Sequence, residues 1–406
     1  EITLKRQYKI ENGILKSYFD TNLAIEDEIL RDILSKNTSV KMKQIVSTIQ
    51  KEQNQIVRSE EYDHLLVQGV AGSGKTSIAL HRAAYLLYRH RKTLKSEDIL
   101  IISPNNIFSS YISDVLPELG EDNLIETTFA QIASAELKKP MQTREEMLDE
   151  IATNPKQESL NEISFKSSFE YLDELLKFLN GDLAQTFTPQ TLRFITNVDE
   201  DGNILEKIEF PEEQTRTLFF DTFKNYSIFD RINKIAWQYA MVFTSQRHYN
   251  KEQNRGLKAR FTKILYNFLP INDVDKIFEI FLTRMGLKIN KKDRVLYMDK
   301  GAMLLIKHYL YGFSHDFSAK YLIIDECQDF TPVDLYMFKK LWPCPSILLG
   351  DINQCIEKCL PPDYNTRIAK LWGSEYVELS KTYRSTKQIA QFAHNLLGLG
   401  NIEYVN

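Results

Sequence analysis

The stretch from residue 64 to residue 102 constrains the fold more than any other part of the sequence. It begins with a short apolar run, His64–Val67, which predicts a buried strand. A glycine-rich turn follows, and apolar residues then recur on one face of a helix expected from about Thr76 to Arg91. A second apolar run, Ile99–Ile102, completes a strand–helix–strand unit, which is typical of a parallel sheet in an α/β protein.

The turn reads G-x-x-x-x-G-K-T, and its residue types suit the binding of a nucleotide's phosphates. Glycines allow successive backbone N–H groups to point at a phosphate, and the start of the following helix adds positive potential. Lys75 is expected to reach the β- and γ-phosphates, and Thr76 to offer its hydroxyl to Mg²⁺. A plain turn is the alternative, but no turn needs Lys-Thr after its last glycine. The predicted nucleotide-binding residues of this loop are Gly69, Val70, Ala71, Gly72, Ser73, Gly74, Lys75 and Thr76.

A pair of carboxylates follows another predicted strand. The apolar run Tyr321–Ile324 leads directly into Asp325 and Glu326. Ligands of an open parallel sheet bind at the carboxyl ends of its strands, so Asp325 is expected to hold Mg²⁺ through water. Glu326 is expected to polarise the attacking water as a general base. Adjacent carboxylates are also common at surfaces, but together with the glycine loop they predict a nucleoside triphosphatase.

The predicted strands are unevenly spaced along the chain. After residue 102 they recur only at Tyr321–Ile324 and Ser346–Leu349, so the stretch between is interpreted as a large, mainly helical insertion into the sheet lobe. Five segments are expected: a helical N-terminal segment at 1–60, the first part of the ATPase lobe at 61–140, the insertion at 141–315, the second part of the lobe at 316–375, and the start of a second lobe at 376–406.

Charge is distributed unevenly within the insertion. Residues 141–230 contain 8 basic and 19 acidic residues, a net charge of −11, whereas residues 231–300 contain 15 and 6, a net charge of +9. In the acidic half, Asp201-Gly202 lies between two strand-like runs and predicts a hairpin. In the basic half, cations alternate with Tyr249, Phe261 and Tyr266, which would suit contacts with phosphates and bases. We favour the simpler alternative, a solvated helix face with its aromatic residues in the core.

Composition excludes several classes of protein. The 406-residue chain is 43% hydrophobic and 26% charged, which is typical of globular rather than disordered proteins. Its net charge of −4 is not that of a polycation, and no apolar run approaches the roughly 20 residues of a membrane span. Four cysteines in a chain of this length favour a reducing compartment without disulfides over a secreted disulfide scaffold. Because they contain no CxxC pair and no His lies among them, small buried side chains are favoured over the alternative of a zinc site. These cysteines are Cys327, Cys344, Cys355 and Cys359.

Two further stretches resemble motifs of the superfamily-one helicase-like ATPases of the UvrD/Rep type. Ile49–Gln53 is similar to that family's glutamine motif, which implies that Gln53 reads the adenine of ATP. Gly350–Gln354 is similar to its third motif, which implies that Gln354 senses the γ-phosphate. The resemblance implies a RecA-like P-loop lobe that binds ATP and Mg²⁺.

Leu379–Ser385 resembles the fourth motif of the same family. The resemblance implies that Tyr383 stacks on adenine and that Arg384 acts as a finger on the γ-phosphate. An arginine suits that role because its planar fork can neutralise charge that is spread over the phosphoryl oxygens. The catalytic residues implied by all the motifs together are Lys75, Glu326, Gln354 and Arg384.

Other blocks are similar to the HelD branch of this superfamily, whose members associate with bacterial RNA polymerase. That resemblance implies a cytoplasmic bacterial protein that uses ATP to remodel RNA polymerase or to release it from nucleic acid. In that branch a coiled-coil arm precedes the region seen here and a second RecA-like lobe follows it. We therefore expect a piece of a longer protein, which by itself binds Mg-ATP but hydrolyses it slowly. The blocks are Tyr18–Ile25, Thr48–Asn54, Ala79–Leu87, Ser103–Asn106 and Val115–Pro117.

Two departures from the DNA helicases put translocation along a strand in doubt. Ser77 stands where they carry an arginine, and Ser103–Asn106 replaces a Thr-x-Thr-Asn block that grips single-stranded DNA. A 3′–5′ DNA helicase that contacts duplex DNA through residues 231–300 is nevertheless the second hypothesis. The third is a polymerase-binding module that holds a nucleotide without turnover, and Glu326 argues against it because mere binding needs no general base.

Overall fold

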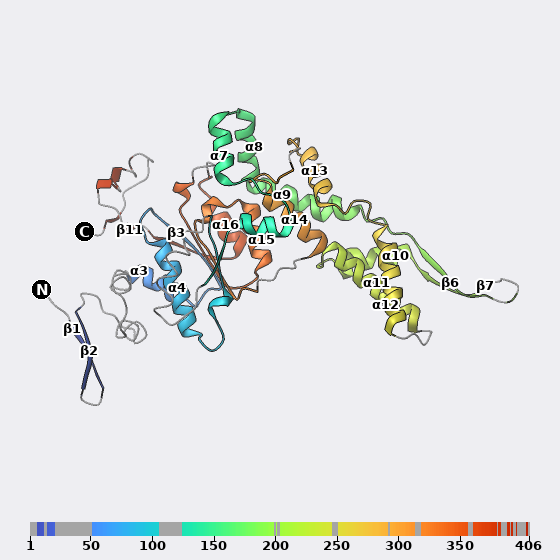
Figure 1. The fold of residues 1–406 in the computed structure, drawn as a ribbon, viewed down its shortest axis with the longest axis horizontal. Coiled ribbons are helices and arrows are strands. Elements are labelled where there is room, and N and C mark those ends of the chain that lie inside the picture. Colours follow the sequence, from blue (N-terminus) through green and yellow to red (C-terminus); the bar gives the residue numbers. More distant parts are fainter. Residues whose placement is uncertain are drawn as a thin grey trace.

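The computed structural model describes residues 6–11, 14–20, 51–104, 124–198, 200, 204–245, 251–290, 293–312, 318–355, 360–379, 381–382, 388–389, 391–392, 395 and 403–404. Within these residues, six parallel strands form a sheet in the order β10-β3-β9-β8-β4-β5 (Figure 1). The predicted α/β fold with a parallel sheet, the arrangement of a RecA-like lobe, is confirmed. The strands are β3 (His64–Gly69), β4 (Ile99–Ile102), β5 (Ile125–Thr127), β8 (Tyr321–Ile324), β9 (Ser346–Gly350) and β10 (Glu375–Leu379).

The four strands predicted from apolar runs occupy the four central positions of the sheet. Both of their faces are covered, which is why each strand reads as a continuous apolar run. The edge strands β5 and β10 were not predicted, because the first is short and the second is mostly exposed. The expected start of a second lobe at 376 is wrong for residues 376–379, since Val377 pairs with Val67 in the first sheet.

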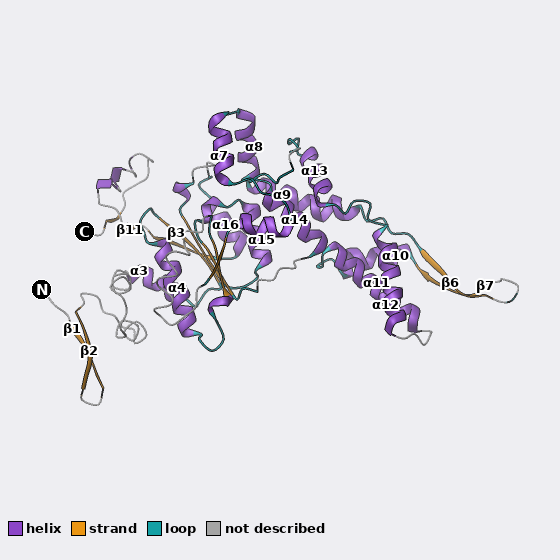
Figure 2. Ribbon diagram, viewed as in Figure 1, coloured by secondary structure: helices purple, strands orange, loops and turns teal. Residues whose placement is uncertain are grey.

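Alternate residues of the strands supply two separate cores. Leu65 and Ile323 face α3 (Lys51–Arg58) and α4 (Lys75–Arg89) on one side of the sheet. Leu66 and Leu348 belong to the larger core on the other side. Figure 2 shows this layered arrangement of helices around the strands. The helices that contribute to the larger core beside the sheet include α6 (Phe129–Leu137), α14 (Lys300–Tyr311), α15 (Pro332–Leu341) and α16 (Tyr364–Trp372).

Part of the N-terminal segment forms strands where the sequence analysis predicts helix. β1 (Arg6–Glu11) and β2 (Ile14–Asp20) pair as an antiparallel hairpin, so the expectation of a helical segment over 1–60 is wrong for them. The overlooked signal is Asn12-Gly13 between the two runs, a dipeptide that favours tight hairpin turns. The helical periodicity expected over residues 22–50 lies outside the described residues.

Between α6 and α14 the described chain is mainly helical and leaves the sheet. The predicted hairpin is present as β6 (Leu192–Val198) paired with β7 (Ile204–Phe210), and it projects away from the sheet lobe (Figure 1). The described part of the chain has no helix that is long and apolar enough to cross a membrane. The helices here are α7 (Arg144–Thr153), α8 (Gln157–Lys166), α9 (Phe169–Lys177), α10 (Glu212–Thr217), α11 (Ile228–Ser245), α12 (Lys251–Tyr266) and α13 (Val274–Arg284).

Short turns and one small strand pair complete the described elements. Three 3₁₀ turns, η1 (Ser96–Asp98), η5 (Cys327–Asp329) and η6 (Ile352–Gln354), precede or follow strands of the sheet. Two π-helical turns, η3 (Phe178–Leu183) and η4 (Leu218–Thr222), continue α9 and α10. Near the end of the chain, β11 (Lys381–Thr382) pairs in parallel with β12 (Glu403–Tyr404).

Substitution of Phe338 on α15 tests how far this core stabilises the lobe. Its ring is fully buried and meets Phe129 edge-on at 4.8 Å and Phe330 at 5.1 Å between ring centroids. Phe338→Ala should lower the free energy of unfolding by about 3–5 kcal/mol, because it removes a buried ring and leaves a cavity. Urea titration measures this change. Substitution of the exposed Met241 by Ala serves as the control, and it should change the free energy of unfolding by no more than about 0.5 kcal/mol. An equal loss in both variants would contradict the claim that Phe338 belongs to the stabilising core.

Candidate nucleotide-binding site

The glycine loop closes tightly between β3 and α4. Gly72 and Gly74 have left-handed backbones, with φ of +77° and +84°, which glycine adopts without strain. A Cβ added to Gly69 would lie 2.3 Å from Ser73 Oγ, so a side chain at this position would fill the loop. The Val70 N–H donates to the Leu379 carbonyl at 3.3 Å, and this bond ties the loop to the end of β10. The loop therefore has the narrow, backbone-lined form that suits a phosphate.

Two buried polar side chains face into this loop. Lys75 Nζ donates to the Gly69 carbonyl at 2.9 Å, so the ammonium group lies across the loop. Ser73 is fully buried, and its Oγ has no hydrogen-bond partner among the described residues. A buried hydroxyl without a partner is destabilising, whereas a phosphate oxygen in the loop would supply the missing acceptor. The residues present thus fit a bound phosphate group.

Gln53, expected to read adenine, contacts the loop itself. Its Nε2 donates to the Ser73 carbonyl at 2.7 Å, so the α3 side chain reaches the predicted phosphate cradle. Buried Arg82 holds α3 against α4, since its Nη1 donates to the Ile56 carbonyl at 2.7 Å. Lys381 forms an ion pair with Glu52, the neighbour of Gln53. Adenine reading by Gln53 stays a prediction.

The two predicted magnesium ligands meet although they are far apart in sequence. Thr76 Oγ1 lies 3.4 Å from Asp325 Oδ2 and donates to it. The other carboxylate oxygen of Asp325, Oδ1, is buried and has no hydrogen-bond partner among the described residues. Burial, followed by the negative charge of Glu326, raises the pKa of Asp325 to about 7. A divalent cation at this oxygen would replace the missing partner and favour the ionised carboxylate, so the donor set fits Mg²⁺.

Glu326 has a left-handed backbone, with φ of +48°, which is unusual for a residue other than glycine. Backbone strain of this kind occurs where surrounding contacts hold a functional side chain in place. Gln328 supplies such a contact, because its Nε2 donates to Glu326 Oε2 at 3.0 Å. The strand end at β8 thus presents one buried carboxylate and one partly exposed, hydrogen-bonded carboxylate.

Hydrogen bonds link Glu326 to the predicted γ-phosphate sensor. Gln328 accepts from the Asp351 backbone N–H at 2.9 Å, and Asp351 Oδ2 accepts from Gln354 Nε2 at 2.7 Å. Glu326 and Gln354 are therefore joined through two buried residues, Gln328 and Asp351.

Gln68 is a site residue that the sequence analysis missed. Its Nε2 donates to Asp351 Oδ1 at 2.8 Å, and its Oε1 accepts from the Ile352 N–H at 3.1 Å and from Asn365 Nδ2 at 3.0 Å. The side chain thus holds η6 and α16 against β3. The available signal was a glutamine at the end of an otherwise apolar strand, directly before the first glycine of the loop.

Some predicted site residues lie outside the described residues. These are Tyr383 and Arg384 of the expected fourth motif, together with Cys359 of the considered zinc site. Within the described ranges, no group of three or more His, Cys, Asp or Glu side chains is placed to hold a metal ion. Cys327 is buried beside the carboxylates, and burial raises the pKa of its thiol.

A parallel sheet with a glycine loop that fits a phosphate after one strand, and a buried carboxylate that fits Mg²⁺ after another, is typical of a P-loop nucleoside triphosphatase. The UvrD/REP helicase N-terminal domain matches residues 49–357, most of the chain. The chain therefore belongs to this family of ATP-hydrolysing, nucleic-acid-directed helicase proteins. No curated protein matches the sequence at a significant level.

Asp325 should destabilise the protein when Mg²⁺ and nucleotide are removed. Its pKa lies above the ordinary value of 3.8 in the folded state, so the folded protein loses stability as the pH rises from about 4 to about 7. In EDTA at pH 8, the free energy of unfolding of Asp325→Asn should therefore be at least about 1 kcal/mol higher than that of the parent chain. The gain should shrink as the pH falls to 5, and urea titrations at several pH values measure it. If the variant is less stable than the parent chain at pH 8, the claim that the buried Asp325 carboxylate destabilises the metal-free protein is contradicted.

Proposed function

We propose that this chain binds and hydrolyses Mg²⁺-ATP and couples turnover to the remodelling of RNA polymerase or its release from nucleic acid. The meeting of Thr76, Asp325 and Glu326 at the carboxyl ends of parallel strands carries the hydrolytic part of this proposal. The polymerase part rests on the resemblance to the HelD branch. The same resemblance implies that the protein acts in the bacterial cytoplasm, where RNA polymerase works.

The predicted site residues divide the work of ATP hydrolysis among them. Backbone N–H groups of the glycine loop and Lys75 bind the phosphates, while Thr76 and Asp325 would hold Mg²⁺, which would supply positive charge to the phosphates. Glu326, oriented by Gln328, takes a proton from the attacking water. Gln354 and Arg384 are assigned to the γ-phosphate by their motifs alone.

Two observations support a protein rather than a DNA strand as the partner. The β6–β7 hairpin projects from the lobe, and the acidic half of the insertion that contains it has a net charge of −11 (Figure 1). Such an arm suits a basic protein surface and repels phosphates. Ser103, in the block that replaces the DNA grip of the helicases, is buried and donates to Glu126 Oε1 at 2.9 Å. Its hydroxyl is therefore engaged inside the protein.

A 3′–5′ DNA helicase is the second candidate, and one observation favours it. Trp237 on α11 is 55% exposed, and Arg255 and Lys263 on the neighbouring α12 are exposed as well. An exposed indole can stack on a base, and exposed cations can contact phosphates. Phe261, by contrast, is buried in the core, so this member of the aromatic series follows the simpler interpretation of the basic half.

Substitution of the assigned base separates turnover from nucleotide binding. Glu326→Gln keeps the size and the hydrogen-bonding capacity of the side chain but cannot accept the proton of water. It should retain ATP affinity and lose at least about a hundredfold in hydrolysis rate. Equilibrium binding of labelled ATP and a phosphate-release assay measure the two quantities. Near-normal turnover would mean that another residue is the base, and no turnover even in the complete protein with Glu326 intact would favour a binding module.

The partner is tested by the ATPase rate of the complete protein, measured alone, with single-stranded DNA and with core RNA polymerase. Stimulation by polymerase, with little response to DNA, is expected. Strong stimulation by DNA that falls steeply with salt concentration would instead favour the helicase candidate, since phosphate contacts release counterions.

A further inference from the structure

The turn that follows Glu326 holds this residue by its backbone and by its side chain. In η5, the Asp329 N–H donates to the Glu326 carbonyl at 2.9 Å, while Gln328 Nε2 donates to Glu326 Oε2 at 3.0 Å. The backbone bond closes the turn on a residue whose φ of +48° is unfavourable for any residue other than glycine. The conformation of Glu326 therefore depends on where Asp329 is held.

Arg144, the first residue of α7 in the insertion, forms an ion pair with Asp329. Its Nη1 lies 3.1 Å from Asp329 Oδ2, and the two side chains are only 18% and 9% exposed. Because charges shielded from water are little screened by salt, this pair constrains the turn more than a surface pair would. Asp329 is also the third carboxylate within five residues, after Asp325 and Glu326, and Arg144 compensates its charge.

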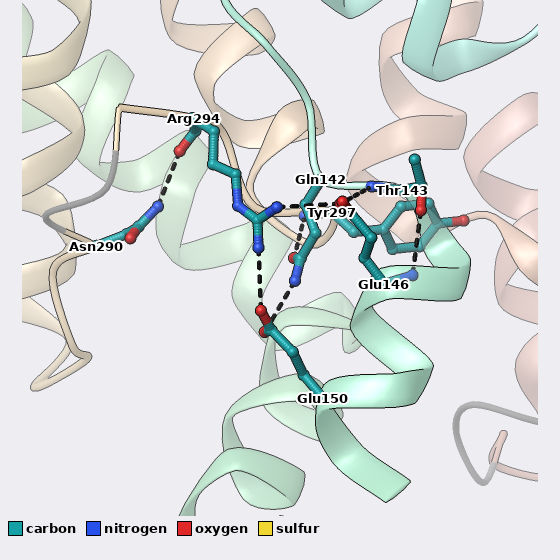
Figure 3. Close-up of polar contacts among 7 residues, drawn as sticks. All are labelled: Gln142, Thr143, Glu146, Glu150, Asn290, Arg294 and Tyr297. Carbon is teal, nitrogen blue, oxygen red and sulfur yellow. Dashed lines mark hydrogen bonds and ion pairs between the residues drawn. The ribbon is translucent and has the colours of Figure 1, made fainter. Parts of the chain in front are cut away.

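The start of α7 is itself fixed, so Arg144 is held in a defined position (Figure 3). Thr143 caps the helix: its Oγ1 accepts from the Glu146 N–H at 3.1 Å, and its own N–H donates to Glu146 Oε2 at 3.0 Å. Arg294 then bridges two turns of α7, with Nη1 3.1 Å from Glu146 Oε2 and Nη2 3.0 Å from Glu150 Oε1. These bonds hold the helix on either side of Arg144.

Buried Gln142 anchors the chain just before α7. Its Nε2 donates to Glu150 Oε2 at 3.0 Å, and its Oε1 accepts from the Tyr297 N–H at 3.1 Å. Its backbone N–H donates to the Val295 carbonyl at 2.8 Å. Gln142 and Glu150 also line a cleft of about 170 Å³ between α7 and α8. The position of Arg144 is therefore set by the packing of the insertion and not by the sheet.

We propose that Arg144 is a positioning residue for ATP hydrolysis. Through its ion pair with Asp329 it holds the turn that orients Glu326, so a residue of the insertion, rather than of the sheet lobe, sets the position of the base. The inference rests on the proposed function, because it takes Glu326 as the general base. It adds to that function a residue that lies outside the nucleotide-binding motifs.

Steady-state ATP hydrolysis by the complete protein tests this role. Arg144→Gln removes the positive charge and should lower kcat about tenfold, because a misplaced base is a poor proton acceptor. The KM for ATP and the equilibrium affinity for labelled ATP should stay within about twofold, since the glycine loop keeps its own contacts. Arg144→Lys, which retains the charge, should lose less of kcat than Arg144→Gln. Thermal unfolding checks that both variants are folded.

Arg284→Gln is the matched control. Arg284, on α13 in the same insertion, forms an ion pair with Asp182, and both side chains are about half exposed. Its loss should leave kcat and KM within about twofold of the parent values. Equal loss of kcat in Arg144→Gln and Arg284→Gln would overturn the inference, as would a weaker affinity for ATP in Arg144→Gln with an unchanged kcat.

A double-mutant cycle separates positioning of the base from a general effect on the fold. Arg144→Gln should not slow Glu326→Gln further, because the residue through which it acts is already inactive. A further tenfold loss in the double variant would overturn the inference. Slow turnover by Glu326→Gln with normal turnover by Arg144→Gln would overturn the inference alone, whereas near-normal turnover by Glu326→Gln would refute the assigned base and the inference with it.

Discussion

Parallel pairing of β3, β9 and β8 is the constraint on which the rest of the site depends. Side-by-side pairing of these strands brings their carboxyl ends to one edge of the sheet, although β3 precedes β8 and β9 by about 250 residues or more. The glycine loop follows β3, the carboxylates follow β8 and the Gln354 turn follows β9. The insertion between β5 and β8 can be large because the register of the central strands is set by apolar packing on both faces.

The site places a carboxylate where water cannot solvate it well. Asp325 is buried beside Glu326, which disfavours its ionised form, and one of its oxygens lacks a hydrogen bond among the described residues. Burial of this kind is destabilising in the free protein and becomes favourable when a cation is bound. The left-handed backbone of Glu326 is a second local cost at the same strand end. Both features are local costs to the free protein at this edge of the sheet, and a bound cation would offset the first of them.

Much of this site could be predicted from short-range patterns. The loop from Gly69 to Thr76 and the pair Asp325-Glu326 are recognisable because each motif is continuous in sequence and follows an apolar strand. Edge strand β10 and the hairpin β1–β2 were missed, since neither has the continuous apolar pattern of a buried strand. The role of Gln68 could not be predicted, because its partners Asp351 and Asn365 are about 280 and 300 residues away and meet it only through the sheet.

The sequence by itself determined the chemistry: which residues can bind phosphate, which can hold a cation, and where buried strands begin. Local periodicity and turn chemistry depend on neighbours along the chain, so these features are readable without a structure. The tertiary structure alone decided that Gln328 orients Glu326, that Arg144 reaches Asp329, and that α7 and α8 enclose a cleft. The contact between Arg144 and Asp329 joins the insertion to the lobe and depends on how packed helices and strands meet in space, which no local pattern encodes.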